Sequence, residues 1–330
     1  MLLSMTSAAL SPVTFDDIRQ AQKRIQDAIY RTPLIRLPLK GEIYAKAENM
    51  QRTNSFKLRG AYNFLATMTE EDRQRGVTAP SSGNHAQGLA CAANLFGVPA
   101  AIAIPENAPA FKVEKTKAWG AEVVRCGPSS AERQAAAQHF VDERGYTFVP
   151  PFDHPWIIAG QGTVGLEIAE TMPDVANVLV CTGGGGLLSG IALAMSERCP
   201  NAQIIGVEPE LAADGADSFA KGEIVTWDAA KTTRTVADGV RTQSLGEHTF
   251  AIIKKYVDAF ITVSETAILD SARWYLDEAK LVAEPTGALT LAAYRKLKAG
   301  EAEGVSLRPG KTVLLVSGGN VDLRAVNYYQ

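Results

Sequence analysis

A lysine at a predicted helix start and a run of four glycines are the residues of this chain best suited to chemistry. Lys57 lies in TNSFKLRGA, and Gly183, Gly184, Gly185 and Gly186 follow a buried apolar run. Near a helix N-terminus the dipole disfavours a protonated ammonium, so more of the lysine is nucleophilic amine. Glycines between a strand and a helix let backbone amides turn inward toward an anion. A surface lysine and a ligand-free turn remain the alternatives for either stretch alone.

The glycine-rich stretches favour a single phosphate over a nucleotide. TGGGGLLSG lacks the Gly-Lys-Ser/Thr ending of a nucleotide P-loop. Residues 160–165 read GQGTVG, the spacing of a dinucleotide fingerprint, but the preceding DHPWIIAG contains a proline and only a short apolar run. Because that fingerprint requires a strand directly before it, we do not expect NAD to bind there.

The composition indicates an ordinary globular protein. Hydrophobic residues make up 46% and charged residues 21% of the 330 residues, and the net charge is −3, so we expect no nucleic-acid partner, which would require a basic face. No apolar run approaches the roughly 20 residues of a membrane helix, so no membrane partner is expected. The four cysteines form no C-x-x-C pair and no group with the four histidines, which argues against a zinc site or disulfides. We expect a cytoplasmic protein.

Alternating strand and helix patterns predict an α/β fold with parallel sheets. Thr14 and Asp17 can form a capping box before a helix with an apolar stripe, and a second helix is expected from Ser55. A small unit at 76–153 is predicted to be inserted into a large unit of residues 1–75 plus 154–330, with a cleft between them. The apolar stripe consists of Phe15, Ile18, Ile25 and Ile29. The expected strands are EIYAKAEN, VTAPSS, AAIAIP, AEVVRC, TFVPPF, VANVLV, QIIGVEP and TVLLV.

Three polar or glycine-rich loops follow predicted strands: SSGNHAQG, TGGGGLLSG and SGGN. Ligands of open parallel sheets bind beyond the carboxyl ends of the strands. An amine, a phosphate cradle and polar loops together suit pyridoxal 5′-phosphate (PLP), which requires a lysine, a phosphate site and a partner for its ring nitrogen.

The sequence resembles the fold-type II family of PLP enzymes, in the serine/threonine dehydratase and serine racemase branch. TNSFKLRGA, SSGNHAQG, AGQGTVGLE, GGGGL, VEP, ADGV, AEPTGA and SGGN occur in order over nearly the whole chain. The resemblance implies two open, twisted, mostly parallel sheets flanked by helices, and a homodimer. Two departures, Pro80 before the SSGNH loop and Asn54 where glycine is frequent, bear on the substrate pocket.

The resemblance also implies the cofactor contacts. Lys57 is expected to be the Schiff-base lysine, with Phe56 and Gly239 near the ring. Asn84 is expected to bind the phenolic oxygen and Ser317 the pyridine nitrogen. The expected phosphate-binding residues are Gly183, Gly184, Gly185, Gly186 and Leu187.

The expected substrate is a small β-hydroxy amino acid. The loop Ser81, Ser82, Gly83, Asn84 and His85 opens a helix whose amides and hydroxyls can bind its carboxylate. Ser82 is expected to face Cα opposite the lysine, where it could reprotonate Cα. Arg133, or Arg241 beside Thr242, could bind a second carboxylate, although Arg133 could also lie on a solvated helix face.

The run VEPELAADGAD implies a divalent-cation site. Glu208, the Ala212 carbonyl and Asp214 have the spacing expected from the resemblance, and oxygen ligands suit Mg²⁺ or Ca²⁺. The alternative is a solvated acidic loop.

The predicted function is an L-threonine/L-serine ammonia-lyase that eliminates water to give a 2-oxo acid and ammonia. Lys57, displaced from the cofactor by the substrate amine, is expected to remove the Cα proton. The alternatives are a serine racemase or 3-hydroxyaspartate dehydratase, a β-replacement synthase, and a catalytically silent PLP-binding protein. Because the chain ends soon after SGGNVDL, we expect no isoleucine feedback.

Overall fold

The computed structural model describes residues 11–81, 83–108, 110–127 and 130–322. Its larger sheet has the strand order β1-β2-β10-β7-β8-β9, and only β1 is antiparallel to its neighbour. Its strands are β1 (Leu34–Arg36), β2 (Ile43–Ala47), β7 (Val175–Cys181), β8 (Gln203–Pro209), β9 (Ala259–Val263) and β10 (Lys311–Val316).

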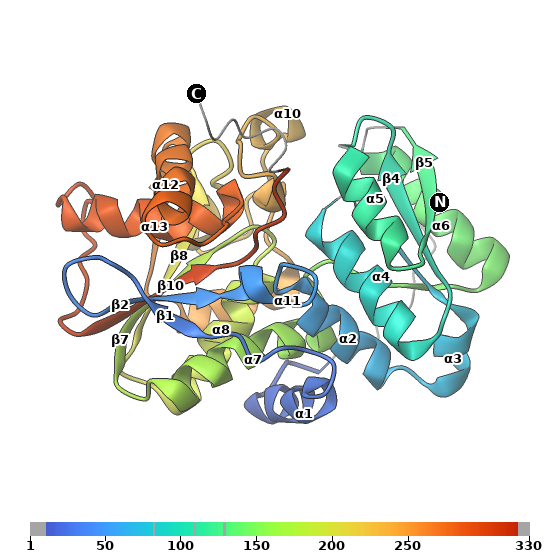
Figure 1. The fold of residues 1–330 in the computed structure, drawn as a ribbon, viewed down its shortest axis with the longest axis horizontal. Helices are drawn as coiled ribbons and strands as arrows, with labels where there is room; N and C mark the ends of the chain where they lie inside the picture. Colours follow the sequence, from blue (N-terminus) through green and yellow to red (C-terminus); the bar gives the residue numbers. More distant parts are fainter. Residues whose placement is uncertain (1–10, 82, 109, 128–129, 323–330) are drawn as a thin grey trace.

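The smaller sheet is parallel, with the order β5-β4-β3-β6. Its strands, β3 (Val77–Pro80), β4 (Ala100–Pro105), β5 (Glu122–Cys126) and β6 (Thr147–Phe148), fall within the range assigned to the small unit, while the unit boundaries stay a prediction. Pro80 is the last residue of β3 and lies beyond the part of the strand that pairs with β6. Two mostly parallel sheets among helices confirm the predicted α/β class (Figure 1).

Helices cover both sheets. The helix α13 packs across β7, β8, β9 and β10, while α7 packs against α8, α2 and α1. In Figure 1 the smaller sheet with α4, α5 and α6 lies to one side of the larger sheet, α2 lies between them, and α7 runs below the larger sheet. The helices are α1 (Phe15–Ile25), α2 (Lys57–Thr67), α3 (Glu70–Arg75), α4 (Asn84–Phe96), α5 (Ala110–Ala118), α6 (Ser130–Arg144), α7 (Pro155–Thr171), α8 (Gly186–Arg198), α9 (Asp214–Lys221), α10 (Ala229–Thr232), α11 (Glu247–Tyr256), α12 (Glu265–Asp277) and α13 (Pro285–Lys298), with 3₁₀ turns η1 (Glu48–Met50) and η2 (Asp238–Val240).

The predicted capping box of α1 is confirmed, because the Thr14 and Asp17 side chains each accept the other's backbone N–H. Two helix limits differ from the prediction. The helix α1 ends at Ile25, whose carbonyl accepts the N–H of Ile29 in a closing turn, so Ile29 lies outside the apolar stripe. The helix α2 begins at Lys57 because Ser55 forms an antiparallel bridge with Gly318.

The backbone explains two notable stretches of the sequence. Asn54 has φ of +55°, a left-handed conformation that favours glycine and that asparagine tolerates.

GQGTVG lies inside α7 with no strand directly before it. A Cβ at Gly160 would lie 2.6 Å from the Arg59 carbonyl oxygen, and one at Gly162 2.9 Å from that of Gly190. These glycines therefore let α7 pack closely on α2 and α8.

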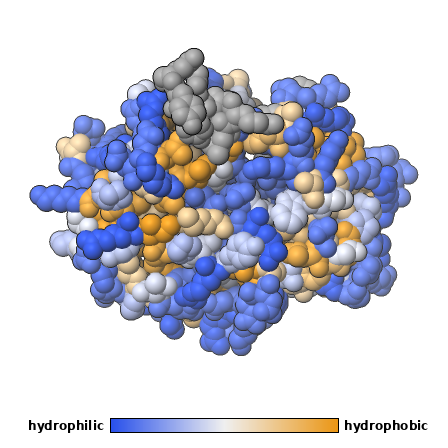
Figure 2. Space-filling model, viewed as in Figure 1, coloured by the Kyte–Doolittle hydropathy of each residue, from blue (hydrophilic) through white to orange (hydrophobic). Residues whose placement is uncertain are grey.

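Hydrophilic side chains cover most of the face in Figure 2, and hydrophobic ones form scattered patches. Across the described ranges, no helix combines the length and the apolarity required to cross a membrane.

Candidate active site

A cleft of about 470 Å³ lies at the carboxyl ends of strands from both sheets. Ser81 follows β3, Gly183 lies two residues beyond β7, and Ser317 follows β10. This is where open parallel sheets bind ligands. Ser82 lies outside the described residues, so its predicted position is not assessed. The predicted cofactor and substrate residues that line the cleft are Phe56, Lys57, Ser81, Gly83, Asn84, His85, Arg133, Gly183, Gly184, Gly185, Gly186, Leu187, Gly239, Thr242 and Ser317.

Lys57 is the first residue of α2, and its amine points into this cleft. The Nζ atom donates a hydrogen bond to the Pro151 carbonyl at 2.8 Å and lies 5.1 Å from the Phe56 ring centroid. Burial lowers the pKa of Lys57 to about 8, and the nearby Cys181 opposes this shift. Its neutral, nucleophilic form is therefore far more accessible near neutral pH than that of a surface lysine.

The tetraglycine loop joins β7 to α8 and can accept an anion. Gly185 has φ of +89° and directly precedes the first residue of α8. A Cβ at Gly184 would collide with the Phe152 ring, and a Cβ at Gly186 would lie 3.1 Å from the Phe152 Cα. The loop therefore requires glycine, and its amides lie at the positive end of a 13-residue helix. These features fit the phosphate of PLP.

Two buried hydroxyls of the cleft lack a partner. Among the described residues, neither Ser317 Oγ nor Thr242 Oγ1 has a hydrogen-bonding partner. The thiol of Cys181, whose pKa burial raises to about 11, lies near Ser317 but is only a weak acceptor. Since unpaired buried hydroxyls are costly, the Ser317 hydroxyl is well suited to donate to a pyridine nitrogen.

The start of α4 supplies Asn84 and His85. The Asn84 amide donates to Glu284 at 2.6 Å and accepts from Asn320 at 2.8 Å. Burial, and next the charge of Asp238, raise the pKa of the Glu284 carboxyl to about 7. Sequence reasoning assigned no role to Glu284, although it lies in the quoted run AEPTGA.

The His85 side chain makes a hydrogen bond to the backbone and so has a structural role. Its Nε2 lies 2.9 Å from the Val149 carbonyl oxygen, and burial, with Lys57 nearby, lowers the pKa of His85 to about 3. The ring is therefore neutral, and Nε2 carries the proton donated to that carbonyl. Only the backbone N–H and Nδ1 of His85 remain for the predicted contact with a substrate.

Basic side chains surround the side of the cleft expected to receive the substrate side chain. Arg133 lines it from α6. Arg241 donates twice to the Thr235 carbonyl, at 3.0 and 2.6 Å, so its guanidinium is fixed to the backbone. Lys112, which sequence reasoning missed, lines the cleft from α5 and pairs with Asp238 of η2. Asp238 lies in the quoted run ADGV, but no motif marks Lys112, because its contact with η2 arises from packing between distant segments.

Glu208 and Asp214 form a buried acidic pair at the end of β8. Glu208 accepts the N–H groups of Gly215 and Ala216 at 3.1 and 2.7 Å. Burial, and next Asp214, raise the pKa of Glu208 well above its ordinary range. Burial raises the pKa of Asp214 to about 7, and its carboxylate oxygens have no hydrogen-bond partner in the described chain.

This pair, buried rather than solvated, fits a cation bound by few protein ligands. Ala212, the third predicted ligand, is also fully buried. Within the described residues, no group of three or more His, Cys, Asp or Glu side chains could hold a metal. A cation here would therefore require carbonyl or water oxygens besides the two carboxylates, as Mg²⁺ and Ca²⁺ accept.

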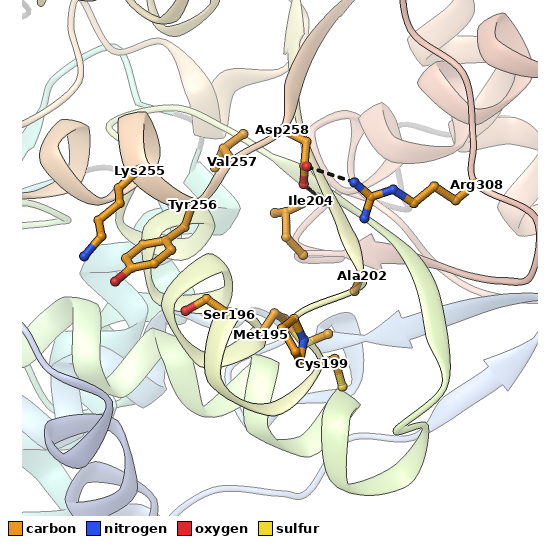
Figure 3. A pocket seen from close by; sticks show the side chains of 11 residues that line it. Met195, Ser196, Cys199, Ala202, Ile204, Lys255, Tyr256, Val257, Asp258 and Arg308 are labelled. Atoms are coloured by element: carbon orange, nitrogen blue, oxygen red, sulfur yellow. Dashed lines mark hydrogen bonds and ion pairs between the residues drawn. The ribbon is translucent and has the colours of Figure 1, made fainter.

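A second hollow of about 230 Å³ lies at the opposite, amino ends of β8, β9 and β10. Figure 3 shows Arg308 paired with Asp258, and the two groups are 3.2 Å apart. Lys255 lies 4.8 Å from the Tyr256 ring centroid. This hollow presents no reactive pair comparable with Lys57 and the glycine loop.

Known proteins resemble this chain over nearly its whole length. Residues 25–318 match the family model described as "Pyridoxal-phosphate dependent enzyme". The L-threonine ammonia-lyase of Thermotoga maritima is 41% identical, covering 96% of this chain and 77% of that protein. The L-threo-3-hydroxyaspartate ammonia-lyase of Saccharomyces cerevisiae is 42% identical over 94% of both. The structure of maize serine racemase aligns over 95% of both chains with a TM-score of 0.89 and 37% identity. Together with the lysine and the glycine loop facing one cleft, these matches show that the chain belongs to the fold-type II family of PLP-dependent enzymes, in the branch of threonine ammonia-lyases and serine racemases.

Proposed function

We propose that this protein is a PLP-dependent ammonia-lyase that eliminates water from L-threonine and L-serine, giving a 2-oxo acid and ammonia. The observation that carries the proposal is the Lys57 amine, with its pKa lowered to about 8, in one cleft with a glycine loop suited to phosphate. Bound PLP supplies an electron sink that acidifies the Cα proton of an amino acid. The threonine ammonia-lyase relative supports this choice of substrate.

The residues of the chain take distinct roles in this proposal. Lys57 takes the Cα proton onto Nζ, a general-base step typically contributing about 10² to 10⁴-fold. The backbone N–H groups of Gly83 and Asn84 at the start of α4 bind the substrate carboxylate. Ser317 would hydrogen-bond the ring nitrogen through its hydroxyl. A ring whose nitrogen is hydrogen-bonded withdraws fewer electrons than a ring whose nitrogen is protonated, and this weaker electron sink suits an elimination. Phe56, Asn84 and Gly239 hold the ring.

The proposal includes a divalent cation. Glu208, the Ala212 carbonyl and Asp214 would hold Mg²⁺ or Ca²⁺ beside β8, where the two buried carboxylates lack a basic partner among the described residues. The cation would balance their charge and fix the end of this strand. The homodimer and the cytoplasmic location stay predictions.

A dicarboxylate substrate is the second candidate. Arg133 and Lys112 both line the cleft, and cations there would bind the second carboxylate of 3-hydroxyaspartate. The relative named L-threo-3-hydroxyaspartate ammonia-lyase supports this second candidate. The similarity to maize serine racemase supports serine racemisation as the third candidate activity.

Ammonia release distinguishes these activities. The purified protein is assayed with L-serine, L-threonine, D-serine and both diastereomers of 3-hydroxyaspartate. We expect the highest kcat/KM with L-threonine or L-serine, and loss of activity and of the visible cofactor band in Lys57→Ala. Lys311→Ala, which removes a surface lysine paired with Asp174, is the control and should retain both. Highest activity with 3-hydroxyaspartate would establish the second candidate, and full activity in Lys57→Ala would refute the proposal.

A further inference from the structure

The helix α11 packs against the tetraglycine loop. A Cβ at Gly185 would lie 2.9 Å from atoms of Thr249 and Ile253, so this helix packs directly against the loop. Thr249 is fully buried, and its hydroxyl donates to the Gly184 carbonyl at 2.8 Å. This hydrogen bond joins two segments 65 residues apart in the sequence.

Fixing the Gly184 carbonyl also fixes the amide that follows it. The peptide bond between Gly184 and Gly185 is trans, so the carbonyl and the next N–H point in opposite directions. With the carbonyl bonded to α11, the Gly185 N–H points away from that helix. The Phe152 ring occupies the space where a Gly184 side chain would lie, which restricts the loop further.

The first turn of α11 is itself anchored by Asp153. The Asp153 carboxylate accepts the N–H groups of Glu247, His248 and Thr249 at 3.0, 3.0 and 3.2 Å. A carboxylate at this position satisfies the free amides and the positive end of α11. Because Asp153 already fills the N-terminus of α11, an external anion cannot bind there, whereas the glycines before α8 line the cleft.

Asp153 also belongs to a segment that reaches the lysine. The Pro151 carbonyl accepts from Lys57, the Phe152 ring packs on the glycine loop, and Asp153 caps α11. Three consecutive residues thus connect the amine, the loop and the helix behind it. A displacement of this segment would move all three together.

We propose that Thr249 and Asp153 are positioning residues that orient the glycine loop toward the phosphate of PLP. This inference rests on the proposed placement of the phosphate at Gly183–Gly186. Neither residue lines the cleft, so both act through the loop rather than by touching the cofactor.

Comparing PLP with pyridoxal, which lacks the phosphate, tests this role. The full chain is freed of cofactor and titrated with each aldehyde, followed by visible absorbance. Thr249→Val should bind PLP about five- to ten-fold more weakly, the value of one net hydrogen bond, while its affinity for pyridoxal is unchanged. Thr249→Ser keeps the hydroxyl and should restore most of the loss. Asp153→Asn should weaken PLP binding in the same selective way.

A matched control separates positioning from general stability. Thr290 is also fully buried and donates its hydroxyl to a distant backbone carbonyl, that of Leu315, at 3.1 Å. Thr290→Val should lower the melting temperature without changing the ratio of PLP to pyridoxal affinity. An equal loss of affinity for PLP and pyridoxal in Thr249→Val would overturn the inference. If Thr249→Val does not fold, an unchanged ratio of PLP to pyridoxal affinity in Asp153→Asn would overturn it instead. A wild-type protein with no preference for PLP over pyridoxal would instead overturn the phosphate placement in the proposed function.

Discussion

Replacing Arg59 by methionine is expected to destabilise the protein more than any single surface change. Arg59 lies two residues after Lys57 on α2 and is fully buried. Its guanidinium donates to both oxygens of Glu48, each at 2.9 Å, and to both oxygens of Glu167, at 2.7 and 2.9 Å. Thr163 accepts a further bond at 3.2 Å. These contacts join α2 to η1 and α7.

The charges of this cluster determine the magnitude. Arg59 and Lys46 balance Glu48 and Glu167, and the Lys46 amine donates to Glu167 at 2.5 Å. Although burial opposes it, the charge of Arg59, with help from Lys46, lowers the pKa of Glu48. Removing Arg59 leaves two buried carboxylates with one cation. Breaking a buried ion pair in this way costs about 3–5 kcal/mol, on the order of a thousand-fold in the ratio of folded to unfolded protein.

Urea unfolding of the holoenzyme, followed by circular dichroism, measures this cost. Arg31→Ala is the control, because Arg31 also pairs with a glutamate, Glu170, but the two side chains are 55% and 34% exposed. Exposed pairs contribute at most about 1 kcal/mol. Adding Glu48→Gln to Arg59→Met removes the excess charge and should recover part of the stability. A loss no larger in Arg59→Met than in Arg31→Ala would refute this account of the cluster.

Two further predictions concern the ligands. Gly184→Ala should abolish the visible cofactor band because its Cβ would collide with the Phe152 ring. Gly304→Ala is the control: its Cβ meets no atom, and its left-handed φ of +69° adds only local backbone strain, so the band should remain. A retained band in Gly184→Ala contradicts the cradle. The raised pKa of Asp214, about 7, means that this carboxyl favours folding while protonated and costs stability as the pH rises through 7. Mg²⁺ should therefore raise the melting temperature more above pH 7 than below it, and this difference should be absent in Asp214→Asn. Asp174→Asn is the control and should behave like the wild type. An equal rise of the melting temperature at both pH values would exclude a metal bound at Asp214.

Short-range chemistry made the core of the site predictable. The tetraglycine between an apolar strand and a helix, and Lys57 beside a helix start, depend on neighbours within a few residues, and the structure brings them to one cleft. Asn54 shows the same principle, because its departure from glycine is explained by the left-handed backbone at that position alone. Helix limits were less predictable, since the bridge between Ser55 and Gly318 joins distant parts of the chain.

The partners that tune the site could not be read from the sequence because they arise from packing between distant segments. Glu284 meets Asn84 across 200 residues, and Thr249 meets Gly184 across 65. A glutamate before a proline and a threonine in a helix carry no sign of such contacts. Their effects are nevertheless large, because a polar group removed from water responds strongly to each partner.

The Asn84 contacts show how such partners tie the two sheets together at the site. Asn84 begins α4 beside the smaller sheet, whereas Glu284 directly precedes α13 and Asn320 follows β10 of the larger sheet. Lys115 of α5 donates to Asn320 at 2.9 Å from the smaller side. These bonds join elements of the two sheets next to Asn84, which lines the cleft. Because Glu284 has a pKa of about 7, loss of its proton strengthens its acceptance from the Asn84 amide as the pH rises through that value. The amide proposed to hold the ring is therefore oriented by a carboxyl that sequence motifs alone did not identify.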